Sequence, residues 1–366
     1  MNPRKRQPPR TVFSLAMTIN GAAVSDFGSV RISYSCSGDG VSGVCMTCLT
    51  FMLPPGAAEY AGGSAVILSG AGTLPDFFIS SHTESDGGFT YICYDSMMKL
   101  ECDLIPDGSA VVWHEYPDKP GVRDLPISTV CGMIASQCGF AVNIGTVSTY
   151  IPYIGSENLI GRSCRDVLEL IARSAVGYFG FYNGEAYFLP YGSAASIGVP
   201  YSIADHEELK NGGTHSYMRL KMSGGGNEYS YGSDSAGAST LTADTQLASA
   251  DLCSAAGSRV VGYQYLGFSC PNAFGSEVVM FPALVSFSGA DGAQLRINYC
   301  TADISAAGVF MQLGSNIVSD AYHYTGLIKR ELVKRFGDGD IWGNFQISKS
   351  DGAAFYYKED QNGQDQ

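Results

Sequence analysis

A helix that runs directly into a tight β-hairpin constrains the fold of this chain more than any other feature. The stretch from Asp124 to Tyr191 predicts a helix, a short linker, a second helix and then the hairpin. Ser163 can cap the second helix, with Asp166 three residues later as a carboxylate variant of the capping box. Gly177 lies where a glycine would end this helix. The apolar residues of its predicted buried face are Val167, Leu168, Ile171, Ala172 and Ala175.

The hairpin is predicted by the pair Asn183-Gly184, which separates two aromatic-rich strands at 178–182 and 185–189. Asn-Gly in this position is the strongest short-range signal for a type I′ turn. The unit contains no arrangement of catalytic side chains. It therefore favours an architectural part over an enzyme.

Composition indicates a β-rich globular protein whose surface is largely covered by other chains. The 366 residues suffice for two or three domains, and glycine (45), tyrosine (22) and phenylalanine (18) are abundant. Charged residues make up only 16%, against about a quarter in an average soluble domain. The alternative is a soluble monomer with a surface rich in Ser, Thr and Gly.

The net charge of −13 argues against nucleic-acid binding through a basic surface. The exception is residues 1–10, where four basic side chains lie among three prolines, and which we expect to be a disordered arm or a docking peptide. Residues 11–23 lack the continuous apolar core of a signal peptide. No run of about 18 apolar residues predicts a membrane span.

The eleven cysteines are predicted to be reduced, buried, small apolar residues of a protein made in a cytoplasm. Their number is odd, no export signal is recognised, and several lie inside predicted helices and strands. They are Cys36, Cys45, Cys48, Cys93, Cys102, Cys131, Cys138, Cys164, Cys253, Cys270 and Cys300.

The predicted fold class is α+β, mainly β, with two antiparallel β-barrel units around an α/β insert that contains the helix and hairpin. The predicted boundaries are a basic disordered arm (1–10), a first β-barrel unit (11–95), the insert (96–208), a second β-barrel unit (209–357) and a polar tail (358–366). Short strands with regularly spaced turns are typical of barrels and sandwiches.

Individual elements follow from the hydrophobic period and from turn residues. Helices are predicted at 96–104, where Asp95 can act as the cap, at 128–138 and at 249–256. Strands are predicted at 12–19, 30–34, 45–51, 64–68, 73–80, 89–93, 217–222, 260–268, 278–287, 293–301 and 310–313. The Gly/Ser-rich segment 223–237 is predicted to be a loop, and 327–335 a short basic helix or an extended segment.

Cys45 and Cys48 have the one spacing typical of a metal or redox site. A zinc site usually takes two such pairs, and no second pair exists. A redox pair should open a helix, whereas the residues around this pair predict a strand. We therefore expect these two thiols on opposite faces of a strand.

No other motif predicts chemistry. The five histidines are scattered and predicted in polar loops, and Trp113 and Trp342 are too few to indicate a sugar-binding platform. Residues 338–340 match only part of a calcium loop, and the glycine runs at 70–72 and 224–226 match no nucleotide-binding pattern. A distant carboxylate pair for glycoside hydrolysis stays open. The prediction is a protein without catalytic, cofactor-binding or metal-ligating residues.

Three stretches, taken in order, resemble the phage baseplate-hub or tail-associated hub family, which is also found in contractile injection systems. Residues 94–100 (Tyr-Asp-Ser-Met-Met-Lys-Leu) resemble the element that ends the first barrel. Residues 163–172 with 184–188 resemble the helix-then-hairpin insert, and 263–271 the point where the second barrel resumes. The resemblance spans roughly residues 90–300 and includes no peptidase, lysozyme or fibre-binding domain.

The resemblance implies a homotrimer in which each subunit donates two tail-tube-like barrels to a six-barrel ring. Such a ring joins a six-fold tail tube, or a distal tail protein, to a three-fold spike or tip, and the tape measure protein is a further candidate partner. It implies a place in the virion tail after assembly in the bacterial cytoplasm, without enzymatic activity. The alternatives are another tail component, such as a distal tail or receptor-binding protein, and a wall-degrading hydrolase at the tip.

Overall fold

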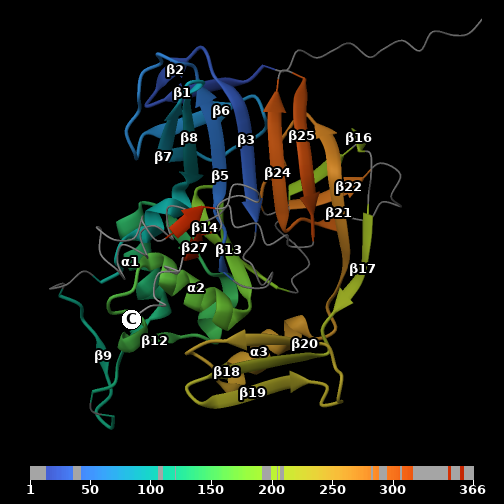
Figure 1. The fold of residues 1–366 in the computed structure, drawn as a ribbon. Helices are drawn as coiled ribbons and strands as arrows, with labels where there is room; N and C mark the ends of the chain where they lie inside the picture. Colours follow the sequence, from blue (N-terminus) through green and yellow to red (C-terminus); the bar gives the residue numbers. More distant parts are fainter. Residues whose placement is uncertain are drawn as a thin grey trace, which may run out of the picture.

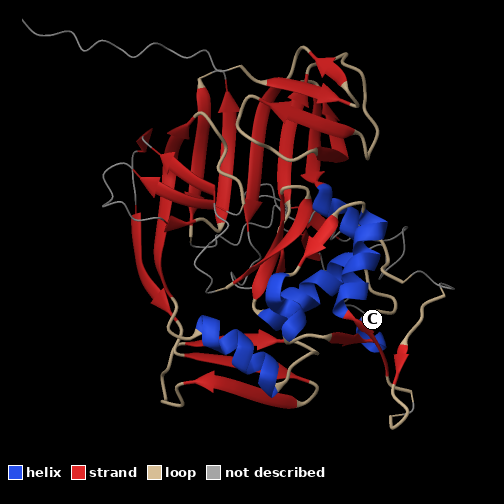
Figure 2. Cartoon of the chain, turned by 180° about the vertical axis from the view of Figure 1, so that it is seen from behind, coloured by secondary structure: helices blue, strands red, loops and turns tan. Residues whose placement is uncertain are grey.

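The fold is α+β and mainly β, as predicted, and its described strands form several sheets, with α1 (Ile127–Cys138), α2 (Cys164–Ala175) and α3 (Ala250–Val260) on one side of the largest (Figures 1 and 2). The computed structural model describes residues 14–35, 43–105, 110–119, 121–191, 199–203, 205–206, 210–281, 283–287, 295–305, 307–315, 345–347 and 355–357. The arm at 1–10, the segment 327–335, Trp342, residues 338–340 and the tail at 358–366 lie outside this part of the chain.

One 12-stranded sheet contains strands from both predicted β units. Its order is β16 (Asp205–His206), β21 (Gln264–Gly275), β25 (Gly308–Gly314), β24 (Tyr299–Ser305), β3 (Gly28–Ser35), β5 (Thr47–Leu53), β8 (Gly88–Asp95), β7 (Phe77–Ser85), β6 (Ala65–Ser69), β1 (Ala16–Ile19) and β2 (Ala22–Val24). Strand β17 (Lys210–Ser216) also pairs with β21.

The centre of this sheet is the antiparallel pair β3 and β24, which joins the two predicted β units (Figure 1). The ion pair between Arg31 Nε and Asp303 Oδ1, at 2.7 Å, crosses the same pair of strands. No pairing between the described strands closes either half into a barrel.

Turn chemistry explains the first half of the sheet. Asn20 and Gly21 both adopt positive φ (51° and 80°) and connect β1 to β2 as the sequence predicts. In β3 the buried side chains alternate, with Val30, Ile32 and Tyr34 directed into the core. Among the described residues the first strand starts at Ala16, and the predicted residues 12–13 lie outside them.

The predicted insert contains a mixed four-stranded sheet that is covered by helices. The sheet order is β11 (Ala141–Asn143), β14 (Glu185–Pro190), β13 (Gly177–Tyr182) and β4 (Gly43–Val44). Its helices are η1 (Ser96–Glu101), α1 (Ile127–Cys138), η2 (Gly145–Thr149), η3 (Ser156–Asn158) and α2 (Cys164–Ala175), and a small sheet of β9 (His114–Glu115), β10 (Arg123–Pro126) and β12 (Tyr153–Gly155) lies beside them. Helix α2 packs against β4 and β13, so the N-terminal segment contributes a strand to this unit.

The predicted helix α2 and the hairpin are confirmed. The Ser163 side chain accepts a hydrogen bond from Asp166 N at 3.1 Å, and Asp166 Oδ2 accepts one from Ser163 N at 3.0 Å. Asn183 and Gly184 form the turn with φ of 50° and 83°. The five apolar residues predicted for the buried face are all buried: Val167, Leu168, Ile171, Ala172 and Ala175.

The end of α2 differs from the prediction. Val176, not a glycine, adopts the left-handed conformation (φ 50°) after the last helical residue. Gly177 instead starts β13, where a Cβ would lie 2.5 Å from Phe188 Cζ and 2.6 Å from the Leu189 carbonyl oxygen. Glycine is required there by close approach of the neighbouring strand, because a side chain would have no room.

The helix predicted at 96–104 is shorter and is a 3₁₀ helix. Asp95 caps it as predicted, since Asp95 Oδ1 accepts a hydrogen bond from Met97 N at 3.0 Å. The helix ends at Glu101 because Cys102 adopts extended backbone geometry. The next residue, Asp103, forms an antiparallel bridge with Ser163.

The segment 223–237 contains a hairpin, so the prediction of a loop is wrong for most of it. Strand β18 (Arg219–Gly224) turns through Gly225 and Gly226, which adopt φ of 58° and 80°, into β19 (Asn227–Gly232). β20 (Thr240–Asp244) pairs with β18 in parallel. Helix α3 (Ala250–Val260) lies against β18 and β19 and extends beyond the predicted 249–256, with Ser249 as its cap. The remaining strands are β15 (Val199–Ile203), β22 (Ala283–Phe287) and β23 (Leu295–Arg296) in one sheet, and β26 (Phe345–Ile347) with β27 (Phe355–Tyr357) in another.

The buried side chains form two cores. One lies in the large sheet, and the other surrounds α1 and α2. Leu220, Met222 and Leu252, from the β18–β20 sheet and α3, belong to the core around α2. The predicted domain boundaries at residues 95, 208 and 357 stay predictions.

Within the part of the chain that the structure describes, no helix is both long enough and apolar enough to cross a membrane.

Candidate functional site

The two cysteines singled out by their spacing do not meet. Cys45 is buried in the core of the large sheet, whereas Cys48 in β5 is buried in the core around α2. The Cys48 thiol lies 4.0 Å from Thr50 Oγ1, and burial raises its pKa to about 12. A thiol with such a pKa is inert at neutral pH.

The histidines were predicted in polar loops, but those that the structure describes lie in strands. His82 in β7 contacts Phe89 and Tyr91 and lies 3.2 Å from Glu59 Oε1. His114 in β9 packs against aromatic rings. His206 and His215 belong to β16 and β17, and His323 lies outside the described residues. Strand pairing, which a single sequence does not reveal, accounts for the difference.

Trp113 packs against the core around α2. The glycines of both runs shape the backbone. Gly70 has φ of 103°, and a Cβ there would overlap the Ser14 carbonyl oxygen. Gly225 and Gly226 form the β18–β19 turn. Neither run has the strand-to-helix setting of a phosphate-binding loop.

Described residues line cavities at two places on the surface that bear on function. One of ≈ 300 Å³ lies beside α2, where Glu169 and Asp244 share the lining with Arg162 and Arg173. Burial raises the pKa of Glu169, although the charges of Arg165 and Arg173 oppose this effect. The other cavity, of ≈ 370 Å³, lies beside the β13–β14 turn and is lined by aromatic and apolar side chains such as Phe181.

A buried polar network connects η1 to α2. Arg165 is only 6% exposed, and its Nε lies 2.6 Å from Glu101 Oε1. Arg165 Nη2 also donates to the Met97 carbonyl oxygen at 3.2 Å. Buried charges need such partners, because an unpaired one costs several kcal/mol. The pair therefore fixes the end of η1 against the first turn of α2.

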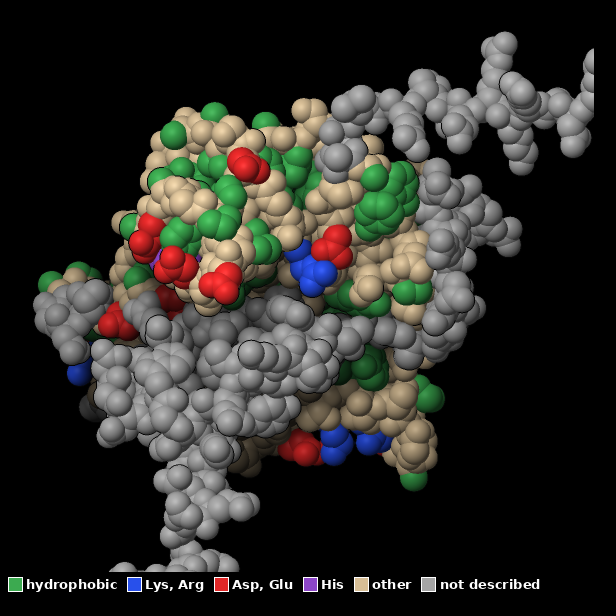
Figure 3. Space-filling view, turned by 45° about the horizontal axis from the view of Figure 1, so that its top comes forward, with side chains coloured by type: hydrophobic (Ala, Val, Ile, Leu, Met, Phe, Trp, Pro, Cys, Tyr) green, Lys and Arg blue, Asp and Glu red, His purple; other side chains and the backbone are tan. Residues whose placement is uncertain are grey.

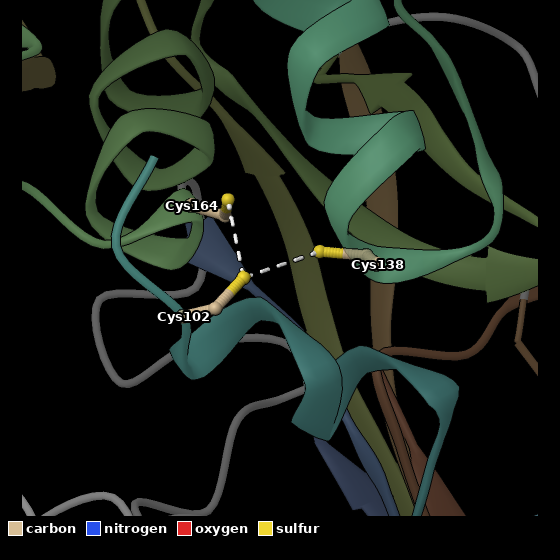
Figure 4. Close-up of side chains that lie close together, drawn as sticks. All are labelled: Cys102, Cys138 and Cys164. Atoms are coloured by element: carbon tan, nitrogen blue, oxygen red, sulfur yellow. Dashed lines mark hydrogen bonds between the residues drawn. The ribbon is translucent and has the colours of Figure 1, made fainter. Parts of the chain in front are cut away.

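Next to this network, three thiols from three elements converge (Figure 4). Cys102 follows η1, Cys138 is the last residue of α1, and Cys164 is the first residue of α2. We call Cys102, Cys138 and Cys164 the three-thiol cluster. Their sulfur atoms all lie within 4.8 Å of one another, and no other group of three or more Cys, His, Asp or Glu residues in the described chain meets this criterion.

The geometry of the three-thiol cluster is compact. Cys102 Sγ lies 3.6 Å from Cys164 Sγ and 3.9 Å from Cys138 Sγ. The Gln137 side-chain oxygen Oε1 accepts from Cys164 Sγ at 3.2 Å and lies 3.6 Å from Cys102 Sγ. Cys138 Sγ donates to the Lys99 carbonyl oxygen at 3.5 Å. Cys138 and Cys164 are buried, whereas Cys102 is half-buried and connects the cluster to solvent.

The three thiols differ in acidity. The pKa of Cys138 lies below its ordinary value, because the Cys164 and Cys102 thiols donate hydrogen bonds to its thiolate and the Lys99 charge favours it. Hydrogen bonding to Cys138 together with burial raises the pKa of Cys164, and burial with the nearby Cys138 charge raises that of Cys102.

Sequence analysis predicted no metal-ligating residue and treated these thiols as separate apolar residues. The cluster was missed because its members lie 36 and 62 residues apart along the chain from Cys102. The available signal was their placement at helix ends: a cysteine follows η1, ends α1 and begins α2.

Comparisons with known proteins give a match of fold. No protein-family model matches the sequence, and no curated protein matches it. Among solved structures, the chain is similar to the 43 kDa tail protein of prophage MuSo2 from Shewanella oneidensis, with a TM-score of 0.50 and 11% identity over 82% of this chain and 96% of that one. It is also similar to prophage tail protein gp18 from Listeria monocytogenes EGD-e, with a TM-score of 0.49 and 11% identity over 82% and 94% of the two chains. The chain thus shares the fold of a phage tail protein.

Proposed function

We propose that this chain is a structural component of a phage tail or a phage-like injection particle. More specifically, we propose a homotrimeric hub that joins a six-fold tail tube to a three-fold spike or tip. The observation that carries the proposal is the likeness to the MuSo2 43 kDa tail protein, because it extends over 82% of this chain and 96% of that one. At 11% identity the likeness concerns the fold, so the position within a tail is our inference.

The charge of the chain supports a place along a DNA path. The net charge is −13, and acidic side chains stand out over the strands of the large sheet on the face seen in Figure 3. A tube through which DNA passes benefits from an acidic lining, since it repels phosphate and prevents sticking.

The large sheet offers surfaces for neighbouring subunits. Among the described strands, β2 has β1 as its one neighbour, and β16 and β17 pair with β21 alone, so the sheet has open edges. An exposed aromatic pair lies across β21 and β25: Phe274 and Phe310 are 37% and 49% exposed, with ring centroids 5.0 Å apart. Open edges and exposed aromatic pairs are typical of surfaces that a partner covers.

The test is the mass of the purified chain by light scattering, combined with negative-stain images of the same peak. We expect a trimer with a central hole. Phe310→Ser should lower the trimer fraction, whereas Ile67→Ser, a matched control that is 46% exposed on β6, should not. A compact monomer at every concentration would contradict the trimer and favour a distal tail or receptor-binding role.

The hydrolase alternative has one observation in its favour, the cavity beside α2 with the raised pKa of Glu169. We propose that the chain is not an enzyme, because Arg162 and Arg173 lie among the three carboxylates of that cavity, Asp166, Glu169 and Asp244. Release of soluble fragments from purified bacterial cell walls, lost in a Glu169→Gln variant of normal stability, would contradict this.

A further inference from the structure

We propose that the three-thiol cluster is a binding site for one Zn²⁺ ion, held by Cys102, Cys138 and Cys164 with the Gln137 side-chain oxygen at the fourth corner. This inference is independent of the proposed function. It rests on the positions of the four ligand atoms, on the backbone that holds them and on the surrounding charges.

Two of the three sulfur–sulfur distances match a zinc–thiolate tetrahedron, and the third lies within 4.8 Å. With Zn–S bonds of about 2.3 Å, the sulfur atoms of a tetrahedral site lie about 3.8 Å apart. The observed distances from Cys102 Sγ are 3.6 Å to Cys164 Sγ and 3.9 Å to Cys138 Sγ. A metal ion could therefore enter between the thiols with little movement of the chain.

The Gln137 side-chain oxygen is well placed to be the fourth ligand. A zinc-bound oxygen at about 2.1 Å would lie about 3.6 Å from each sulfur. Gln137 Oε1 lies 3.6 Å from Cys102 Sγ and 3.2 Å from Cys164 Sγ. Its amide nitrogen donates to the Leu104 carbonyl oxygen at 2.7 Å, which directs the oxygen toward the thiols.

The backbone holds two of the ligands in place before any metal binds. Cys164 N donates to the Cys102 carbonyl oxygen at 2.9 Å, and Leu104 N donates to the Arg162 carbonyl oxygen at 2.9 Å. The ion pair of Glu101 with Arg165 fixes the adjoining residues of the same two segments. Such support lowers the ordering cost of binding.

Two features of the surroundings oppose the cost of burying negative charge at the cluster. Cys164 begins α2, and the dipole of a helix N-terminus stabilises negative charge. The Lys99 ammonium acts on Cys138 from η1. Three thiolates around Zn²⁺ leave a net charge of −1, which these groups can offset. Zinc binding releases the thiol protons to solvent, and no electron is transferred.

Thiolate ligands select zinc over calcium and magnesium, which prefer oxygen. The ion would connect η1, α1 and α2, the three helices that meet at this point of the insert (Figure 4). Its role would be structural, as a link between segments distant in sequence. The alternative to zinc binding is a disulfide between Cys102 and Cys164, which would leave Cys138 as a free thiol.

The test is titration of the reduced, chelator-treated full chain with Co²⁺ and then Zn²⁺. We expect one Co²⁺ per chain, thiolate-to-cobalt charge-transfer absorption, the visible bands of tetrahedral cobalt, and displacement by one Zn²⁺. Cys138→Ala should weaken binding by more than about a hundredfold, since even groups outside the ligand set cost about 10–100-fold. The control is Cys131→Ala, which removes a buried thiol from the same helix outside the cluster and should leave binding unchanged.

Circular dichroism of each variant separates loss of a ligand from loss of the fold, and Gln137→Ala adds a variant that keeps all three thiols. The Gln137→Ala variant should still bind one metal ion per chain, with about tenfold weaker affinity. Unchanged affinity in Gln137→Ala would overturn its place as fourth ligand. Equal metal binding by wild type and Cys138→Ala would overturn the site. The site would also be overturned if the reduced chain bound no metal and peptide mass mapping of the untreated chain showed a Cys102–Cys164 disulfide.

Discussion

Two glycine-to-alanine substitutions should change stability in opposite directions. Gly132 lies in the middle of α1, is exposed, and has no atom within 4 Å of the position where a Cβ would be. Gly177 starts β13, where a Cβ would lie 2.5 Å from Phe188 Cζ and 2.6 Å from the Leu189 carbonyl oxygen. Because the chemical change is the same, the structure alone determines the sign.

The magnitudes follow from the surroundings. Gly132→Ala should stabilise the fold by about 1 kcal/mol, the usual cost of glycine in an exposed helix interior. Gly177→Ala should destabilise it by about 1–3 kcal/mol, because Phe188 is 3% exposed and the Leu189 carbonyl belongs to the paired strand β14, so both resist movement. The two variants should therefore differ by about 2–4 kcal/mol.

Urea unfolding, followed by circular dichroism, measures both changes. Melting temperatures should move in the same directions, by roughly 1–2 °C per kcal/mol, given the unfolding entropy per residue. If Gly177→Ala were as stable as wild type while Gly132→Ala gained stability, the close approach of β14 to Gly177 would be wrong. If Gly132→Ala gained no stability, the placement of Gly132 at an exposed position in the middle of α1 would be wrong.

Three further predictions concern the core and the caps. Burial raises the pKa of Asp95 to about 6 although Thr47 N and Met97 N donate to it. The protonated group therefore contributes stability that is full below about pH 4 and is lost as the pH rises through 6. The stability of wild type relative to Asp95→Asn should fall by up to about 3 kcal/mol across this window in urea titrations, and a pH-independent difference would refute the assignment. Leu168→Asp should abolish folding of the insert and hence assembly, since an unpaired charge in the core costs several kcal/mol; normal particles in electron micrographs would contradict it. Ser163→Ala should cost about 1 kcal/mol in urea unfolding through loss of the α2 cap, and no change would mean that the cap contributes nothing.

Elements whose signals lie within a few residues could be predicted from the sequence. The capping box at Ser163, the turn at Asn183-Gly184 and the cap at Asp95 depend on neighbouring residues, and all three are present. The mainly β class followed from composition and from the spacing of turns. Where a local signal was misread, as for the glycines at 225–226, the same residues that suggested a loop instead form a tight hairpin turn.

Features that depend on distant residues could not be predicted. The pairing of β3 with β24 and the placement of β4 beside β13 follow from tertiary contacts for which a single sequence carries no register. The three-thiol cluster has the same origin, because nothing near Cys102 specifies that Cys138 and Cys164 fold against it. Gly177 is a similar case, since the need for glycine comes from Phe188 across the strand pair.

The β3–β24 pair also has a consequence for synthesis of the chain on the ribosome. Hydrogen-bonded partners such as Arg31 and Asp303 are separated by 272 positions, and at typical translation rates the second is made on the order of tens of seconds after the first. During that interval β3 and its neighbours carry an unpaired edge in the middle of the future sheet. Nascent or truncated chains that end before β24 should therefore aggregate or require a chaperone, and ribosome-stalled fragments of increasing length would locate the point at which protection begins.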